Sequence, residues 1–133
     1  MSEENIELVR RIYEEGLIHQ DPERLVDDLG TPDIEYVNPP YAVEPGVRHG
    51  PDEVARALRR AHEFFASPRY VIRELFDAGD AVVADLSFYA HGRGSESEAV
   101  QREVHTWTLR DGRIARFEWG RDRRKALEAA GLR

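Results

Sequence analysis

The residue of this 133-residue chain that is best suited to proton transfer, His105, lies in a segment that alternates like a β-strand. Glu103 and His105 are two positions apart, and this spacing places both side chains on the same face of a strand. An unperturbed imidazole titrates near neutral pH, so His105 is the candidate general acid or base. A purely structural histidine, with its ring hydrogen-bonded to a neighbour, is the competing interpretation.

Metal chemistry has less support in the sequence. The chain has five histidines and no cysteine, which excludes disulfides, thiolate ligands and a cysteine nucleophile. Apart from Glu103 and His105, no histidine has a partner at the spacing that a metal site on one helix or strand requires, and two ligands make a weak site. We therefore expect no metal and no cofactor. Of the other histidines, His62 lies beside an apolar helical stripe and could approach a pocket.

The strand that carries His105 belongs to a predicted hairpin over 100–119. Asp111 and Gly112 form its turn, because this dipeptide tolerates the positive φ angles of tight hairpin turns. Side-chain alternation places His105 and both tryptophans, Trp107 and Trp119, on one face. This aromatic face needs a cover. The tryptophans are interpreted as either core residues or the wall of a cavity.

The rest of the chain supplies further strands and the helices that cover them. Alternation predicts strands over 33–38, 69–76 and 81–91. Helical spacing predicts a first helix from Ser2 with a stripe continuing to Leu17, a second from Asp21, a third from Pro51 and a last over 123–130. The third helix ends at the Ser67 and Pro68 pair. The proline-rich segment 39–50 reads as a loop that borders a pocket.

This order of elements predicts one α+β domain over 1–133. We expect a curved antiparallel or mixed sheet that forms a cone, with about three N-terminal helices over its concave face and a short C-terminal helix. The concave face is predicted to hold a small, mostly apolar molecule. The predicted substrate-binding residues are Tyr36, Leu58, Phe65, Leu86, Phe88, Trp107, Phe117 and Trp119.

Composition limits the partners. The net charge of −7 disfavours nucleic acid, because phosphates would be repelled. No signal peptide and no apolar run of about 18 residues is recognisable, so we expect no membrane association and a cytoplasmic location. The outer sheet face is predicted to carry Val83, Val104, Thr106 and Thr108, and this apolar surface favours a homodimer.

Several segments resemble the nuclear transport factor 2-like, or SnoaL-like, superfamily of cone-shaped α+β domains. They are Tyr13 in the first helix, 33–37 with Pro39, the helix opening at 48–54, the hairpin segment 106–114 and the closing 126–132. The resemblance covers nearly the whole chain. It implies the fold more strongly than the function, because relatives include isomerases, epoxide hydrolases, dehydratases, polyketide cyclases and binding domains without catalysis.

Comparison with ketosteroid isomerase, a member of this superfamily, implies roles for individual residues. Tyr13 is similar to the tyrosine that donates to the oxyanion, whereas Asn38 stands where the relative has its base. The relative's neutral acid would fall at His105 or Thr106. The acid and arginine set of limonene epoxide hydrolase is not evident, since Asp85 is expected on the opposite face. The competing interpretations are structural: Asn38 forms a turn, and Tyr13 is a core residue with its hydroxyl group hydrogen-bonded inside the protein.

We therefore expect an isomerase, cyclase or dehydratase that acts on an apolar carbonyl compound through His105 and Tyr13, with Asn38 orienting the substrate. The alternative is a ligand-binding or interaction module of the same fold without chemistry.

Overall fold

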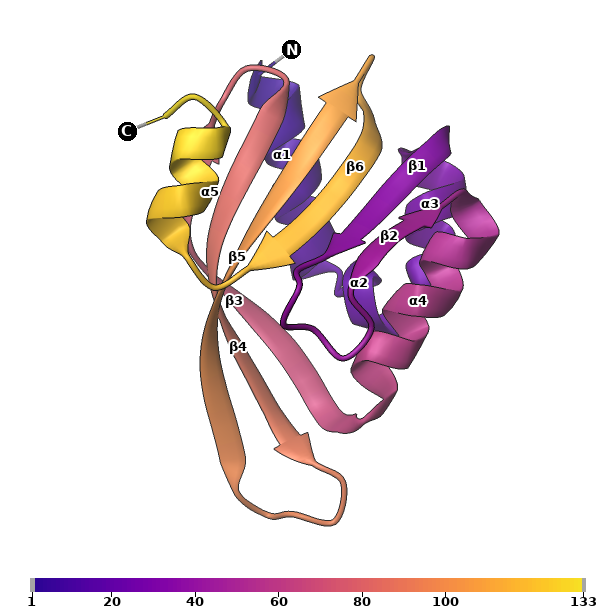
Figure 1. Ribbon diagram of the computed structural model, residues 1–133, viewed down its shortest axis with the longest axis vertical. Coiled ribbons are helices and arrows are strands. Elements are labelled where there is room, and N and C mark those ends of the chain that lie inside the picture. Colours follow the sequence, from indigo (N-terminus) through magenta and orange to yellow (C-terminus); the bar gives the residue numbers. More distant parts are fainter. Residues whose placement is uncertain (1, 133) are drawn as a thin grey trace.

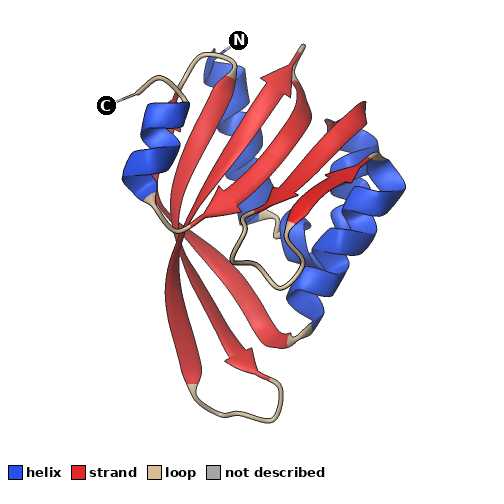
Figure 2. Cartoon of the chain, viewed as in Figure 1, coloured by secondary structure: helices blue, strands red, loops and turns tan. Residues whose placement is uncertain are grey.

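The computed structural model describes residues 2–132, which form five helices and one six-stranded mixed sheet (Figures 1 and 2). The strand order is β2-β1-β6-β5-β4-β3, and β1 runs parallel to β6 while the other neighbours are antiparallel. The sheet is curved and does not close, so the predicted α+β cone is confirmed. The strands are β1 (Gly30–Asn38), β2 (Gly46–His49), β3 (Phe65–Asp77), β4 (Ala81–Gly92), β5 (Glu98–Arg110) and β6 (Arg113–Gly120).

The first helix is shorter than its apolar stripe predicts. α1 (Ser2–Glu14) ends before Gly16, which has φ 65°, and α2 (Leu17–Gln20) begins in a new direction. A glycine adopts this left-handed conformation at little cost, so it ends the helix although Leu17 keeps the spacing. α3 (Pro22–Leu29) begins where predicted, and the carboxylate of Asp21 accepts a hydrogen bond from the amide of Arg24 at 3.2 Å.

Two strand boundaries also differ from the prediction. β2 lies inside the segment predicted to be a loop, and it pairs with β1 through Tyr36 opposite Arg48. Its four residues are too few to show alternation, so only pairing with β1 defines it. α4 (Pro51–Glu63) stops before Phe65, which is the first residue of β3 and not part of a helix. The apolar spacing continues across this boundary, which is why the helix was predicted to run on.

The helices form two unequal layers on the sheet. α1 to α4 cover the concave face, and the main core lies between them and the sheet, with Ile12, Leu25, Leu58, Leu86 and Trp107 among its fully buried members. α5 (Arg123–Ala129) packs against the other face, where Leu127 contacts Val83 and Val104. These two valines were expected to be exposed. The C-terminal helix covers them, because its apolar side faces the sheet.

An ionic cluster around the buried Asp85 attaches α5 to the sheet. Asp85, whose side chain is 5% exposed, accepts hydrogen bonds from Arg102 at 2.9 Å and from Arg123 at 2.7 Å. Arg123 also reaches Glu74 and lies over the ring of Phe76. Asp85 therefore points away from the concave face and has a structural role. None of the helices within residues 2–132 is long and apolar enough to span a membrane.

Candidate functional site

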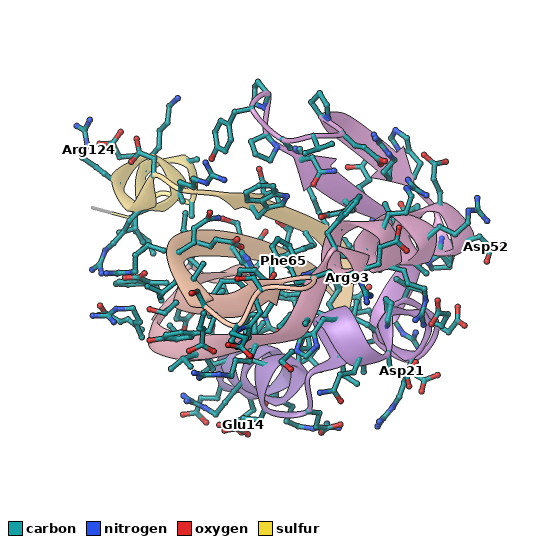
Figure 3. All side chains as sticks on the ribbon, turned by 90° about the horizontal axis from the view of Figure 1, so that it is seen from below. Glu14, Asp21, Asp52, Phe65, Arg93 and Arg124 are labelled. Carbon is teal, nitrogen blue, oxygen red and sulfur yellow. The ribbon has the colours of Figure 1, made fainter. Side chains whose placement is uncertain are left out.

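The concave face of the sheet, α4 and the 39–45 loop enclose a cavity of about 630 Å³. Phe65 lies toward the centre in the view from below, whereas Glu14, Asp21, Asp52 and Arg124 lie at the periphery (Figure 3). Most of the wall is aromatic or aliphatic. The polar side chains of the wall include those of Tyr36, Asn38, Tyr41, Glu44, Arg60, His62, Tyr70, Gln101, Glu103, His105 and Arg121.

β5 brings Glu103, His105 and Trp107 to the concave face, as the alternation predicts. The ring of His105 is almost fully buried and both of its nitrogens are hydrogen-bonded: Nδ1 lies 2.7 Å from the Tyr13 hydroxyl, and Nε2 lies 2.8 Å from Oε1 of Glu103. Trp107 Nε1 donates to the same Tyr13 hydroxyl at 2.8 Å. These four side chains form one continuous hydrogen-bonded chain from the core to the cavity.

The direction of each bond in this series follows from the groups at its two ends. The Glu103 carboxylate can only accept, so Nε2 of His105 carries the ring hydrogen and donates it to Oε1. In the neutral ring Nδ1 is then an acceptor for the Tyr13 hydroxyl hydrogen, and the Tyr13 oxygen accepts from the Trp107 indole, which can only donate. The arrangement selects one neutral tautomer of His105 and aims it at Glu103.

Tyr13 lies behind the cavity wall and is not one of the residues that line it. Burial raises the pKa of its hydroxyl well above the ordinary value, which keeps the group protonated. Its hydrogen and one of its two acceptor lone pairs are used within the protein. The geometry therefore differs from the implied role of Tyr13 as a direct donor to a substrate oxyanion, and gives Tyr13 a supporting position behind His105.

Glu103 is the last residue in this series of hydrogen bonds, and it faces the cavity. Its Oε1 accepts from His105, and its Oε2 accepts from Nε2 of Gln101 at 3.0 Å. Each carboxylate oxygen has a second lone pair, so Glu103 can still accept a bond from a ligand. The sequence placed Glu103 on the same strand face as His105 but suggested no catalytic role for it. The i, i+2 spacing of the two residues was the available signal that their side chains could interact.

Asn38 also lines the cavity, at the end of β1 where the turn begins. Its Oδ1 accepts from Trp119 Nε1 at 2.6 Å, and its Nδ2 donates to the carbonyl of Glu44 at 2.7 Å. This second bond supports the turn-former interpretation. An amide nitrogen has two hydrogens, so one remains for an acceptor on a ligand.

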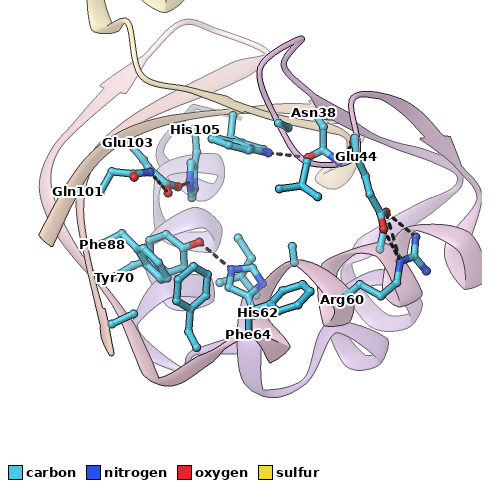
Figure 4. A pocket seen from close by; sticks show the side chains of 18 of the residues that line it. Asn38, Glu44, Arg60, His62, Phe64, Tyr70, Phe88, Gln101, Glu103 and His105 are labelled. Carbon is cyan, nitrogen blue, oxygen red and sulfur yellow. Dashed lines mark hydrogen bonds and ion pairs between the residues drawn. The ribbon is translucent and has the colours of Figure 1, made fainter. Parts of the chain in front are cut away.

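A second polar pair was not singled out from the sequence. His62 of α4 is buried in the wall, where its Nδ1 lies 2.8 Å from the carbonyl of Leu58 and its Nε2 lies 2.8 Å from the Tyr70 hydroxyl (Figure 4). Burial lowers the pKa of His62 to about 4, so the ring is neutral at physiological pH. The sequence placed His62 beside the apolar stripe of this helix, and its i, i+4 spacing from Leu58 was the available signal for an inward-facing side chain.

The 39–45 loop is fastened to α4 at one side of the cavity. The Glu44 carboxylate accepts from Arg60, with Nη2 to Oε1 at 3.0 Å, and Arg48 lies 3.6 Å away. Figure 4 shows this pair across the cavity from Gln101, Glu103 and His105. Glu44 and Arg60 are exposed to solvent, whereas Arg48 is partly buried. The hydrogen bond from Arg60 holds the pKa of Glu44 below its ordinary value.

The predicted substrate-binding residues fall into two groups. Five of them line the cavity: Tyr36, Phe65, Phe88, Phe117 and Trp119. The other three, Leu58, Leu86 and Trp107, lie in the core behind the wall, because the helices pack directly onto their part of the concave face. Trp107 reaches the cavity only indirectly, through its hydrogen bond to Tyr13 and through its stacking on Phe117 with ring centroids 4.2 Å apart. Within residues 2–132, no three His, Asp or Glu side chains are arranged to hold a metal ion.

The fold and the site together define a cone-shaped domain of the nuclear transport factor 2-like class, with a largely apolar cavity. The family model for the SnoaL-like domain matches residues 9–117, which is most of the chain, so the protein belongs to the SnoaL-like domain family. No curated protein matches the sequence.

Solved structures share the fold over almost the whole chain. A putative SnoaL-like polyketide cyclase from Jannaschia sp. CCS1 superposes with a TM-score of 0.79 at 19% identity, covering 99% of this chain and 94% of the other. TerC, co-crystallised with polyporic acid, superposes with a TM-score of 0.72 at 26% identity, covering 96% of this chain and 98% of TerC. A nuclear transport factor 2-like protein of unknown function from Burkholderia pseudomallei K96243 superposes with a TM-score of 0.75 at 25% identity, covering 94% of this chain and 95% of the other.

Proposed function

We propose that the protein binds a small, mostly apolar carbonyl compound and moves a proton on it, as an isomerase, cyclase or dehydratase does. The observation that carries this proposal is the hydrogen-bonded chain from Trp107 through Tyr13 and His105 to Glu103, which ends at the cavity. A carboxylate that is held in position at an apolar cavity is well placed to act as a general base. We assign that role to Glu103, with His105 and Tyr13 as positioning residues.

In the proposed step, Glu103 removes a proton from the carbon next to the carbonyl group. The C–H bond breaks, its electron pair moves to the carbonyl oxygen, and the remaining amide hydrogen of Asn38 stabilises the resulting enolate. Glu103 then returns the proton to another carbon, or the enolate attacks within the same molecule. His105 keeps its ring hydrogen on Nε2 throughout and holds the carboxylate oriented.

The relatives support a small-molecule ligand. TerC was crystallised with polyporic acid, and a ketosteroid isomerase-like protein from Catenulispora acidiphila was crystallised with trimethylamine. The second relative is 17% identical, so it supports only the idea that this fold encloses ligands. A binding module without chemistry is the second candidate. It is favoured by Asn38, which cannot act as a base at the position where the resemblance implies one.

Deuterium exchange distinguishes the two candidates. Cyclic ketones that bind the protein are incubated with it in D₂O, and the loss of the α-proton signal is followed by NMR. We expect Glu103→Gln to slow exchange by about 10²-fold or more, as for loss of a general base, while ligand affinity changes little. Glu118→Gln, on the outer face, is the control and should exchange like the wild type. Equal exchange by the Glu103 variant would refute its role, and no exchange by the wild type would favour a binding module.

We also propose that the protein forms a homodimer through the outer sheet face. α5 leaves a groove beside β5 and β6 that is lined by small side chains, such as Thr108 and Ala126, and by charged ones of both signs, such as Glu118 and Lys125. A surface of this kind can complement itself about a two-fold axis. Sedimentation velocity at micromolar concentration is the test. We expect a dimer that Thr108→Arg converts to a monomer, and a monomeric wild type would refute the proposal.

A further inference from the structure

We propose that the cavity selects ligands that carry a hydroxyl group, which donates its hydrogen to the wall formed by Tyr70 and Glu103, and that His62 is the residue that makes Tyr70 an acceptor. This inference rests on the proposed function and narrows its substrate class to carbonyl compounds that also carry a phenol or enol hydroxyl group on a flat apolar body. It assigns a specificity role to His62, which is not one of the four residues that are hydrogen-bonded in series from Trp107 to Glu103.

The direction of the Tyr70 hydrogen bond follows from its neighbours. The Leu58 carbonyl, 2.8 Å from Nδ1 of His62, can only accept, so the ring hydrogen must be on Nδ1. The ring is neutral, so Nε2 carries a lone pair and accepts the hydrogen of the Tyr70 hydroxyl over 2.8 Å. The Tyr70 oxygen therefore offers only lone pairs to a molecule in the cavity.

Tyr70 and Glu103 both line the cavity and are both neighbours of His105. The Tyr70 and His105 rings make an edge-to-face contact with centroids 5.1 Å apart, and His105 is hydrogen-bonded to Glu103. The negative charge of Glu103 adds to the effect of burial in raising the pKa of Tyr70, which keeps the hydroxyl protonated and bonded to His62. Two acceptors on the wall of one cavity favour a ligand that brings a donor, because an acceptor facing them would be repelled and left unpaired.

The surrounding aromatic rings favour a flat ligand body. Phe88 packs against Tyr70 with centroids 4.7 Å apart and against Phe65 at 5.3 Å, and Phe117 and Trp119 line the cavity as well. Aromatic rings pack well on other rings through their faces and edges. Asn38 supplies a donor to the cavity, which suits a carbonyl oxygen on the same ligand.

A matched pair of probes tests the inference. 2-Naphthol and 2-methoxynaphthalene share the same flat body, but only the naphthol can donate a hydrogen bond. Isothermal titration calorimetry with the wild-type protein should show the naphthol binding about threefold to tenfold more tightly, which is the usual effect of one hydrogen bond. Tyr70→Phe removes one acceptor and should reduce this ratio by at least half.

Two further variants separate the direction of the bond from general packing. His62→Leu frees the Tyr70 hydrogen to point at the ligand, so 2-methoxynaphthalene should bind more tightly than it does to the wild type. The ratio of the 2-naphthol affinity to the 2-methoxynaphthalene affinity should then fall to about one or below. Tyr89→Phe removes the same hydroxyl from a tyrosine of β4 that contacts Arg69 outside the cavity, and should leave the ratio unchanged. A change in packing alone would weaken both probes equally.

The outcomes are distinguishable. Equal binding of both probes to the wild type would overturn the inference but leave the proposed carbonyl chemistry intact. An unchanged ratio in both the Tyr70 and His62 variants would also overturn it. Binding of neither probe to the wild type would overturn the inference together with the proposed apolar cavity ligand, whereas failure of Glu103 to support deuterium exchange would affect only the catalytic proposal.

Discussion

Replacing Tyr13 by phenylalanine should destabilise the protein more than the loss of one hydroxyl usually does. The hydroxyl joins Trp107 to His105 through bonds of 2.8 Å and 2.7 Å, and all three side chains are buried. The aromatic ring remains in the variant, so packing is nearly preserved. The effect therefore reports the two hydrogen bonds.

The expected size follows from the groups left without partners. Two intramolecular hydrogen bonds contribute about 1 kcal/mol each, and a buried polar group without a partner costs about 1–3 kcal/mol. Trp107 would lose its acceptor and Nδ1 of His105 its donor. Water could satisfy one of the two, so we expect Tyr13→Phe to lower the free energy of unfolding by about 2–4 kcal/mol. This corresponds to a fall in Tm of roughly 10 °C for a domain of this size.

Urea unfolding followed by far-ultraviolet circular dichroism measures this change without using Trp107 as the probe. The double variant Tyr13→Phe with Trp107→Phe has no unpaired indole, so it should show a coupling energy of about 1 kcal/mol or more between the two sites. Tyr89→Phe is the control and should cost under about 0.5 kcal/mol. A cost for Tyr13→Phe as small as that of the control would refute the hydrogen-bonded chain described here.

Three further predictions concern other parts of the molecule. Asp85→Asn should lower the free energy of unfolding by about 2–3 kcal/mol, because Arg102 and Arg123 lose a buried partner but remain half exposed; hydrogen exchange should then be faster in α5 than elsewhere. Arg60→Gln should leave stability within about 1 kcal/mol, as for exposed ion pairs, but should raise the ligand dissociation rate in stopped-flow experiments if the 39–45 loop retains ligands. Folding lowers the pKa of His62 from 6.5 to about 4, so the unfolded protein binds a proton at a higher pH than the folded protein does. The free energy of unfolding should therefore fall by roughly 3 kcal/mol as the pH drops from 7 to 4. The His62→Leu variant should lose this part of the pH dependence in urea titrations.

Much of the fold could be predicted because side-chain alternation has only two outcomes on a strand. Placing Trp107 on the concave face also places Glu103 and His105 there, and the strand pairing keeps that assignment. The dipeptide Asp111 and Gly112 turns the chain as expected, with positive φ at both residues. Short β2 could not be predicted, since pairing with β1 and not local preference defines it.

The site was less predictable, because hydrogen-bond partners far apart in sequence leave no local pattern. Nothing near Tyr13 indicates that it meets His105, which is 92 residues further along the chain. Resemblance to relatives suggested that Tyr13 contacts a substrate, whereas the structure turns its hydroxyl toward the protein. His62 shows the same limit: its helical spacing predicts an inward side chain, but its pairing with Tyr70 depends on where β3 crosses α4.

The parallel pairing of β1 with β6 has a consequence for how the cavity is made during synthesis. The bond between Asn38 and Trp119 joins positions 81 residues apart, and the cavity wall contains residues from both strands. Such distant contacts form late, because a long loop must close before they contribute. A nascent chain that ends before β6 has all the helices of the concave face but only part of the wall, so we expect ligand binding to appear only after Trp119 has left the ribosome.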